Sequence, residues 1–196
     1  MVTGHVISEQ IDGEASYQQR ILEPIAAAVA PFDDEEILDP EWVNARGAIV
    51  RFVRDAVEIR VIDVQEQPAA DLAIAELTVA VVRALVEERW SGYAVQSVLD
   101  ETELEIALLA AIRDGEAARL EHPGLLACLG RSEPCTLQTL WQGLASELGV
   151  GGAALELILE RGTLARRILT ALERDSLRDV YGALCDCTRA GRSFVP

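Results

Sequence analysis

The segment spanning residues 42–71, WVNARGAIVRFVRDAVEIRVIDVQEQPAAD, constrains the fold of this chain more than any other part. It is the one stretch in which apolar and charged residues alternate with a period of two, a pattern typical of β-strands. We therefore predict a β-hairpin over about residues 47–63. Glu58 and Arg60 would share one face of the second strand. The apolar residues would share the other face: Val57, Ile59 and Val61.

The register of this hairpin decides which charged side chains meet. A tight turn centred on residues 54–55 would set Arg51 directly opposite Glu58 and make Arg60 the diagonal neighbour of Arg51. One ligand could then touch both arginines. Because buried charge without a partner is costly, an Arg/Glu/Arg face is unusual for a sheet that only packs a core. The spacing predicts a binding site for an anionic group, whereas a cross-strand ion pair on a solvated face remains the simpler alternative.

The rest of the chain is predicted to be helical. An apolar period near 3.6, with Pro, Gly, Asp and Thr at the boundaries, marks the segments. The predicted helices are 14–30 with a kink or restart at Pro24, 69–89, 102–113 capped by Asp100 or Thr102, one or two short helices within 115–129, 136–148, 151–161, 163–173, and 175–190 with Asp175 as N-cap. Helix 69–89 is apolar nearly all round, so we expect it to be buried.

These elements predict an α+β fold that is mostly helical, with one antiparallel β-hairpin followed by a helical C-terminal bundle. An isolated hairpin is marginally stable in water, so this one is expected to complete a larger sheet whose other strands lie elsewhere. We divide the chain into a loosely ordered lead-in over 1–13, a helix, hairpin and buried helix over 14–90, and a helical region over 91–196.

Charge excludes several classes of function. The formal net charge is −16, and all 17 basic residues are arginine. Such a chain is predicted to bind neither nucleic acid nor anionic membranes, since both require a basic surface. Without lysine, the chain cannot supply a P-loop lysine or form a Schiff base. We expect neither a membrane-spanning helix nor a signal peptide, and the four cysteines suit a reducing, cytoplasmic environment.

Four sequence blocks within 44–68 resemble glutamate–cysteine ligase family 2. The blocks are Asn44–Ile49, Arg51–Arg54, Glu58–Arg60 and Asp63–Pro68. The strings SYQQRIL, RGTLARRIL and LCDC..AGRSF extend the similarity over most of the chain. Two residues depart from the pattern: Val53 stands where Asp is expected, and Gln67 where Cys is expected.

This resemblance implies an ATP-dependent carboxylate–amine ligase with a glutamine-synthetase-like fold, acting in glutathione biosynthesis. Such an enzyme activates the γ-carboxylate of glutamate as an acyl phosphate and joins it to cysteine or another amine, using ATP and Mg²⁺. Complete members are longer. We therefore expect this chain to be a C-terminal segment that is inactive alone and needs the missing N-terminal half, a partner chain or a homo-oligomer.

By the same resemblance, Arg51, Glu58 and Arg60 would be the catalytic residues. Arg51 and Arg60 would hold a substrate carboxylate or the transferring phosphoryl group, a role that suits the bidentate guanidinium. Asn44 and Arg46, with Arg60, would bind substrate. Glu58 would orient the arginines or reach a metal through water, although a single carboxylate cannot assemble a Mg²⁺ site.

Several features have structural explanations that compete with functional ones. Asp63, Gln65 and Glu66 could face the site or form an acidic cluster at a helix N-terminus. The tryptophans are predicted to pack helices against the sheet: Trp42, Trp90 and Trp141. A non-catalytic helical assembly module, using its exposed hairpin edge to pair with another chain, is the alternative function.

Overall fold

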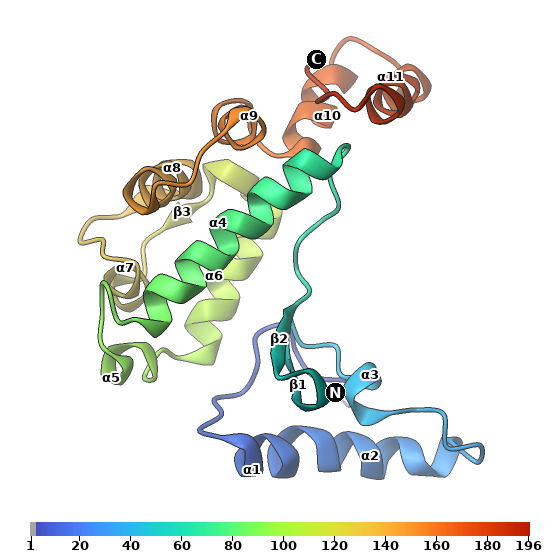
Figure 1. Ribbon diagram of the computed structural model, residues 1–196, viewed down its shortest axis with the longest axis vertical. Helices are drawn as coiled ribbons and strands as arrows, with labels where there is room; N and C mark the ends of the chain where they lie inside the picture. The colour runs from blue at the N-terminus through green and yellow to red at the C-terminus, as the bar shows by residue number, and fades with distance from the viewer. Residues whose placement is uncertain (1–2) are drawn as a thin grey trace. The chain divides into compact units, whose positions relative to one another are not determined.

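The computed structural model describes residues 3–196 and is mostly helical, with two small antiparallel sheets (Figure 1). The chain forms two compact units. The first ends at Asp63 and includes the short segment Asp100–Glu105; the second consists of Val64–Leu99 and Ile106–Pro196. No helix in residues 3–196 combines the length and apolar character needed to cross a membrane.

A long helical stretch with an irregular turn opens the first unit. It runs through α1 (Glu14–Tyr17), a π-helical turn (Gln18–Leu22) and α2 (Glu23–Val29), followed by a 3₁₀ turn (Ala30–Phe32). The π-helical turn ends two residues before Pro24. A proline lacks the N–H of a regular helix and clashes with the preceding turn, so a widened turn accommodates it. The predicted disturbance at Pro24 is therefore confirmed, as a bulge within the helix.

The predicted hairpin is present, as β1 (Ala48–Arg51) and β2 (Ala56–Ile59). Its predicted register is wrong, because Arg51 pairs with Ala56 and Glu58 pairs with Ile49. Four residues, 52–55, therefore form the connection, where a two-residue turn was predicted.

Two local interactions explain the longer connection. Phe52 leaves the strand and packs its ring edge-on against Tyr17, with ring centroids 5.5 Å apart. Asp55 takes the left-handed conformation at φ 48° and ψ 50°, which Asp adopts more readily than most residues. The register differs from the predicted one by two residues, so Arg51 and Glu58 stay on the same face as diagonal neighbours.

The hairpin packs on the helix of the first unit. The helix buries four residues in this contact: Tyr17, Ile21, Leu22 and Ile25. Five partly buried residues pack against them: Ile11, Val29, Val43, Val50 and Phe52. The apolar residues of β2 and its extension are exposed: Val57, Ile59 and Val61. Within residues 3–196, no further strand extends this hairpin.

Helix α4 (Pro68–Val86) lies near the start of the second unit, with Pro68 at its first position. The predicted helix, 69–89, extended three residues too far at its C-terminal end. Its predicted burial is only partly correct. Leu77 and Val81 belong to the core, whereas Leu72 and Val86, on the opposite side of the helix, are exposed. The apolar residues of α4 therefore form two faces, one buried in the core and one exposed to solvent.

The remaining helices follow the predicted order, except that two short helices, over Pro40–Val43 and Tyr93–Gln96, were not predicted. They are α3 (Pro40–Val43) in the first unit, α6 (Glu101–Asp114), which bridges the division between the units in sequence, and, in the second unit, α5 (Tyr93–Gln96), a 3₁₀ turn (Gly115–Ala117), α7 (Pro123–Cys128), α8 (Leu137–Leu148), α9 (Ala153–Arg161), α10 (Leu164–Leu172) and α11 (Leu177–Ala190). Asp100 caps α6, as one of the two predicted alternatives. The predicted cap Asp175 is wrong, because the adjacent Ser176 accepts the N–H of Asp179.

A second sheet was not predicted. β3 (Arg119–Leu120) pairs with β4 (Cys135–Thr136), so part of the segment predicted as short helices is extended. Each strand has only two residues, too few to show a period.

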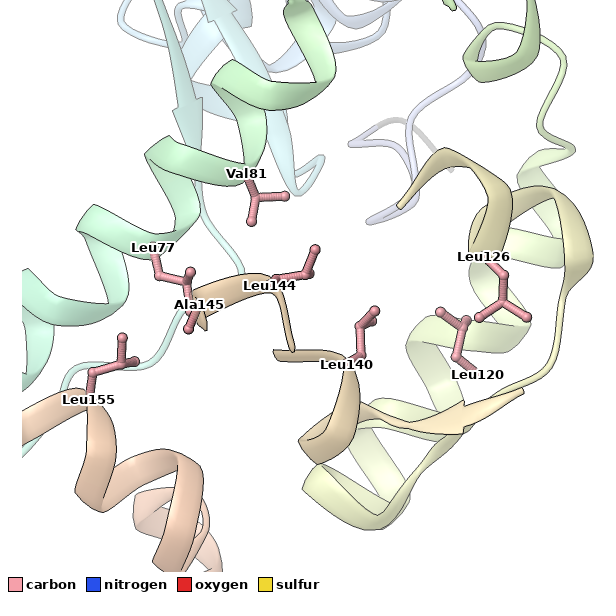
Figure 2. Packing of buried hydrophobic residues seen from close by; sticks show 8 residues of the cluster. All are labelled: Leu77, Val81, Leu120, Leu126, Leu140, Leu144, Ala145 and Leu155. Atoms are coloured by element: carbon pink, nitrogen blue, oxygen red, sulfur yellow. The ribbon is translucent and has the colours of Figure 1, made fainter. Parts of the chain in front are cut away.

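Two apolar clusters form the core of the second unit. In the larger one, α4 packs on α8 and α9, and Figure 2 shows side chains of these helices converging. Its buried residues are Leu77, Val81, Leu120, Leu126, Leu140, Leu144, Ala145 and Leu155. The smaller cluster joins α10, α11 and the C-terminal Phe194. Trp90 and Trp141 pack against the larger cluster, but Trp42 is 75% exposed, so its predicted packing role is wrong.

Candidate anion-binding site on the hairpin

Glu58 joins two arginines on one face of the hairpin. Arg51 donates from Nε to Oε2 of Glu58 at 2.8 Å, and Arg60 donates from Nε to Oε1 at 2.8 Å. The three side chains predicted to act together are therefore in direct contact, although the register that brings them together differs from the predicted one.

Each arginine has a second anchor besides Glu58. Arg51 donates from Nη1 to the backbone carbonyl of Glu41 at 3.3 Å and to its carboxylate at 3.4 Å. Arg60 donates from Nη1 to the carbonyl oxygen of Asn44 at 2.6 Å. Within residues 3–196, the Nη2 group of neither arginine has a hydrogen-bond acceptor. Two positioned guanidinium groups thus retain donors that an added anion can use.

The charges of this cluster support one another. Hydrogen bonds from Arg51, and then from Arg60, hold the pKa of Glu58 below its usual value. In turn, the hydrogen bond to Glu58 raises the pKa of Arg51. The two arginines and the carboxylates of Glu58 and Glu41 sum to no net charge. An anion would therefore be held by directed N–H donors rather than by an excess of positive charge.

Asn44 and Arg46 are buried, and their side chains form hydrogen bonds with other residues of the first unit. Asn44 donates to the Tyr17 hydroxyl at 3.0 Å and accepts from Nη1 of Arg46 at 3.1 Å. Arg46 also donates to Glu9, with Nε 2.6 Å from Oε2, and this bond lowers the pKa of Glu9. A Cβ on Gly4 would lie 2.4 Å from Nη1 of Arg46, so glycine allows the backbone to cover this guanidinium.

The hairpin connects to these buried residues through its backbone. The carbonyl oxygen of Asn44 fixes Arg60, and the Tyr17 hydroxyl accepts the N–H of Val50 at 3.2 Å. Of the five predicted site residues, the structure brings Arg51, Glu58 and Arg60 into one cluster. Asn44 contacts that cluster through its backbone carbonyl oxygen, which accepts a hydrogen bond from Arg60, and Arg46 is paired with Glu9.

These residues do not fit a Mg²⁺ site by themselves. Both oxygens of Glu58 already accept hydrogen bonds from arginine, whereas Mg²⁺ requires several oxygens in near-octahedral array. In the described part of the chain, no group of three or more His, Cys, Asp or Glu residues could hold a metal ion. We therefore assign no metal-dependent step to this cluster.

A buried ion pair in the second unit was missed by the sequence reasoning. Nη1 of Arg167 on α10 lies 2.7 Å from Oε1 of Glu66, and the exposed fractions of the two side chains are 1% and 2%. The N–H of Phe194 also donates to Glu66, at 2.9 Å. Glu66 thus links the start of α4 to α10 and to the C-terminal segment. The sequence had suggested two other roles for Glu66, a site-facing group or part of an acidic cluster at a helix N-terminus. No local pattern could reveal the ion pair, because 101 residues separate the two partners.

Comparison with known proteins identifies the family. An uncharacterized protein of Archaeoglobus fulgidus is 48% identical over 52 residues, which are 26% of this chain and 14% of that protein. No solved structure matches the chain. The sequence model of glutamate–cysteine ligase family 2 matches residues 5–183 of this chain. With nearly its whole length matched, the chain belongs to glutamate–cysteine ligase family 2.

Proposed function

We propose that the Arg51–Glu58–Arg60 cluster is the part of an ATP-dependent carboxylate–amine ligase that holds the anionic reactant. The observation that carries this proposal is one carboxylate, Glu58, bridging two guanidinium groups that each retain a donor. Family membership supplies the reaction class, in which a carboxylate is activated by ATP and transferred to an amine. Glutamate as the carboxylate and cysteine as the amine are the substrates we propose.

The chemistry of this reaction explains the use of arginine. Forming an acyl phosphate brings a carboxylate and a phosphoryl group together, and negative charge must be stabilised on both. Guanidinium groups bind such oxygens in pairs and keep their charge at every physiological pH. Glu58 fixes the orientation of both groups before the reactant arrives, which reduces the cost of ordering them on binding.

We further propose that residues outside this cluster complete the active site and hold Mg²⁺–ATP. The hairpin presents only two arginines and an engaged carboxylate, and the chain matches 14% of the Archaeoglobus relative. These remaining residues would come from another segment of the whole protein or from a partner chain. On this proposal the 196-residue chain binds the anion but does not turn over alone, and the enzyme is cytoplasmic.

The half-site can be tested by binding, without activity. In ¹⁵N-labelled protein, the arginine side-chain N–H resonances are followed while glutamate or inorganic phosphate is added. We expect the resonances of Arg51 and Arg60 to shift, and Arg60→Ala to abolish the shift at Arg51. Arg113→Ala is the matched control, because Arg113 forms an exposed ion pair with Asp114 on α6. Absence of any shift at Arg51 and Arg60 would overturn the proposal.

The catalytic part of the proposal is tested on the chain combined with the segment that supplies the remaining residues. Phosphate release from ATP is measured with glutamate, with and without cysteine and other amines. We expect Arg60→Ala to lower glutamate-dependent turnover about 100-fold or more, the usual effect of removing one donor to developing charge. Glutamate-dependent turnover that is equal in Arg60→Ala and Arg113→Ala would refute the catalytic role.

A second candidate is a non-catalytic assembly role, which the exposed apolar side chains of the hairpin favour. Val57, Ile59 and Val61 are 40–65% exposed and occupy alternate positions of one strand and its extension. Such a strip suits contact with another protein surface. This candidate predicts association that Val57→Lys weakens, together with no response of Arg51 or Arg60 to glutamate or phosphate.

A further inference from the structure

One face of α4 carries an apolar stripe that no other described part of the second unit covers. The stripe consists of Leu72, Ala75, Val79, Val82 and Val86, all exposed. Leu72 and Val86, at its two ends, are 70% and 78% exposed. The residues that α4 buries, such as Leu77 and Val81, lie on the opposite side of the helix. The stripe is therefore a second apolar face, beyond the one that builds the core.

The spacing of the stripe is that of a coiled-coil seam. Its members follow one another at intervals of three, four, three and four residues, which is the a/d pattern of a heptad repeat with Leu72 at a. A helix that only packs on its own domain does not need this second, strictly 3.5-residue period. The partner that fits such a seam is another helix of the same kind.

The charges beside the seam show which helix fits. Glu76 and Arg83 occupy the two e positions next to the stripe, and both are exposed. Within residues 3–196, neither residue forms an ion pair. Two antiparallel α4 helices, with Val79 of one against the partner's Val82, place Glu76 beside the partner's Arg83. By two-fold symmetry, Arg83 meets the partner's Glu76.

A parallel arrangement of the same helices is less favourable. It would bring Asp71, at a g position, beside the partner's Glu76, which places like charges together. Asp71 is also already engaged, since it accepts the N–H of Gln65 at 2.8 Å. The antiparallel arrangement has no such conflict, because Thr78 and Leu85 are the other flanking residues along the seam.

We propose that the α4 stripe is a homodimer interface in which two copies of the chain pair antiparallel about a two-fold axis. Each copy contributes Val79 and Val82 to the centre of the seam. Glu76 and Arg83 form reciprocal ion pairs on its edge. The stripe belongs to the second unit and the Arg51–Glu58–Arg60 cluster to the first, and the proposed dimer does not depend on the proposed ligase activity.

The first experiment is sedimentation velocity on the 196-residue chain over a series of concentrations. We expect a concentration-dependent monomer–dimer equilibrium that Val79→Glu abolishes. Ile112→Glu is the matched control: Ile112 is another exposed β-branched residue, on α6, and its substitution should leave the equilibrium unchanged. A chain that is monomeric throughout the series, or a dimer that Val79→Glu does not weaken, would overturn the proposal.

A charge-exchange experiment tests the arrangement and leaves the apolar residues intact. Glu76→Arg alone, or Arg83→Glu alone, turns both ion pairs of the dimer into repulsive contacts. We expect either change to weaken self-association about tenfold. A mixture of the two variants restores both pairs and should form heterodimers, detected by native mass spectrometry with one variant isotope-labelled. The double variant Glu76→Arg/Arg83→Glu should also dimerise.

The outcomes of this exchange are decisive for the antiparallel register. Circular dichroism first establishes that each variant retains the helical content of the original chain. Weakened single variants without recovery in the mixture would show that Glu76 and Arg83 do not face each other, and the proposed dimer would be wrong. Single variants that dimerise as well as the original chain would contradict it equally.

Discussion

At the scale of single residues, the buried pair of Arg167 and Glu66 has the largest expected effect on stability. Arg167 donates to Glu66 at 2.7 Å and also to the carbonyl oxygen of Phe194. Nε of Arg167 has no partner in the described part of the chain, so the guanidinium is not fully satisfied. Removing one partner leaves the other charge buried and alone, which costs more than the pair itself contributes.

Arg167→Met is therefore expected to destabilise the second unit by about 3–5 kcal/mol, as for other buried pairs that lose one partner. The free energy of unfolding is measured by urea titration at neutral pH. Arg189→Met serves as the control, because Arg189 pairs with Asp186 on the surface of α11 and should contribute at most about 0.5 kcal/mol. Equal losses in the two variants would contradict the importance given to burial.

Stability should also depend on pH through Glu66. Burial raises the pKa of Glu66, but the hydrogen bonds from Arg167 and from the N–H of Phe194 outweigh it, so the pKa lies below its usual value. A carboxyl group with a depressed pKa stabilises the fold fully above its unfolded pKa of about 4.3, and that stabilisation is lost as pH falls below this value.

The measurement for this prediction compares the original chain with Glu66→Gln in urea titrations from neutral pH down to acid. We expect Glu66→Gln to be less stable at neutral pH and the difference to shrink as the pH falls through the depressed pKa. Other carboxylates with lowered pKa values titrate in both proteins and cancel in the difference. A difference that does not change with pH would contradict this assignment.

At the scale of elements, local signals in the sequence mark several of the helix boundaries, although α4 ends three residues before the predicted end and Ser176, not Asp175, caps α11. Pro68 begins α4, His122 caps α7 with its ring nitrogen, and Gly149 and Gly191 end α8 and α11 in the left-handed conformation. Each of these residues acts within one turn of its own position. Such signals are fully contained in a short stretch of sequence.

Elements whose form depends on distant contacts were not predicted. The register of the hairpin follows from Phe52 packing on Tyr17, 35 positions earlier in the chain by their residue numbers. The exposed face of α4 could not be distinguished from its buried face, because the composition of both is apolar. In the candidate site, the alternation predicted that Arg51, Glu58 and Arg60 share a face, whereas the burial of Arg46 on Glu9 required the folded chain.

The hairpin connection offers a test of the observed register. Asp55 is left-handed while Arg54 belongs to a 3₁₀ turn, so a β-branched residue should be tolerated at Arg54 and strained at Asp55. We expect Asp55→Val to destabilise the first unit by about 1–2 kcal/mol, and Asp55→Gly not to destabilise it. Arg54→Val is the control and should change stability by less than about 0.5 kcal/mol.

Urea titration followed by the fluorescence of Trp42, with Trp90 and Trp141 replaced by phenylalanine, reports on the first unit. A two-residue turn of the type common in hairpins needs positive φ at both central positions. Equal losses from Arg54→Val and Asp55→Val would therefore favour the tighter turn and contradict the register described above.

At the scale of the whole molecule, the division into two units has a chemical basis. Both large apolar clusters lie entirely in the second unit, and Glu66 fastens the beginning of that unit to α10. The first unit has its own smaller cluster around Tyr17. Between them, residues 60–65 form neither helix nor strand. The second unit should therefore keep its fold when the chain is cut in this connection.

Limited proteolysis with thermolysin, which cleaves before large apolar residues, tests this division. Val61, Ile62 and Val64 are exposed in the connection, and Val64 is 80% exposed. We expect the lasting product to begin between Val61 and Val64 and to retain its helical circular dichroism, because the cut spares Glu66. The glycine-rich loop before α9 offers Val150 as a competing site, but that side chain packs against the larger cluster and should resist cleavage. Mass spectrometry that places the first lasting cut at Val150, or loss of helical signal after cleavage at Val61–Val64, would contradict an independently folded second unit.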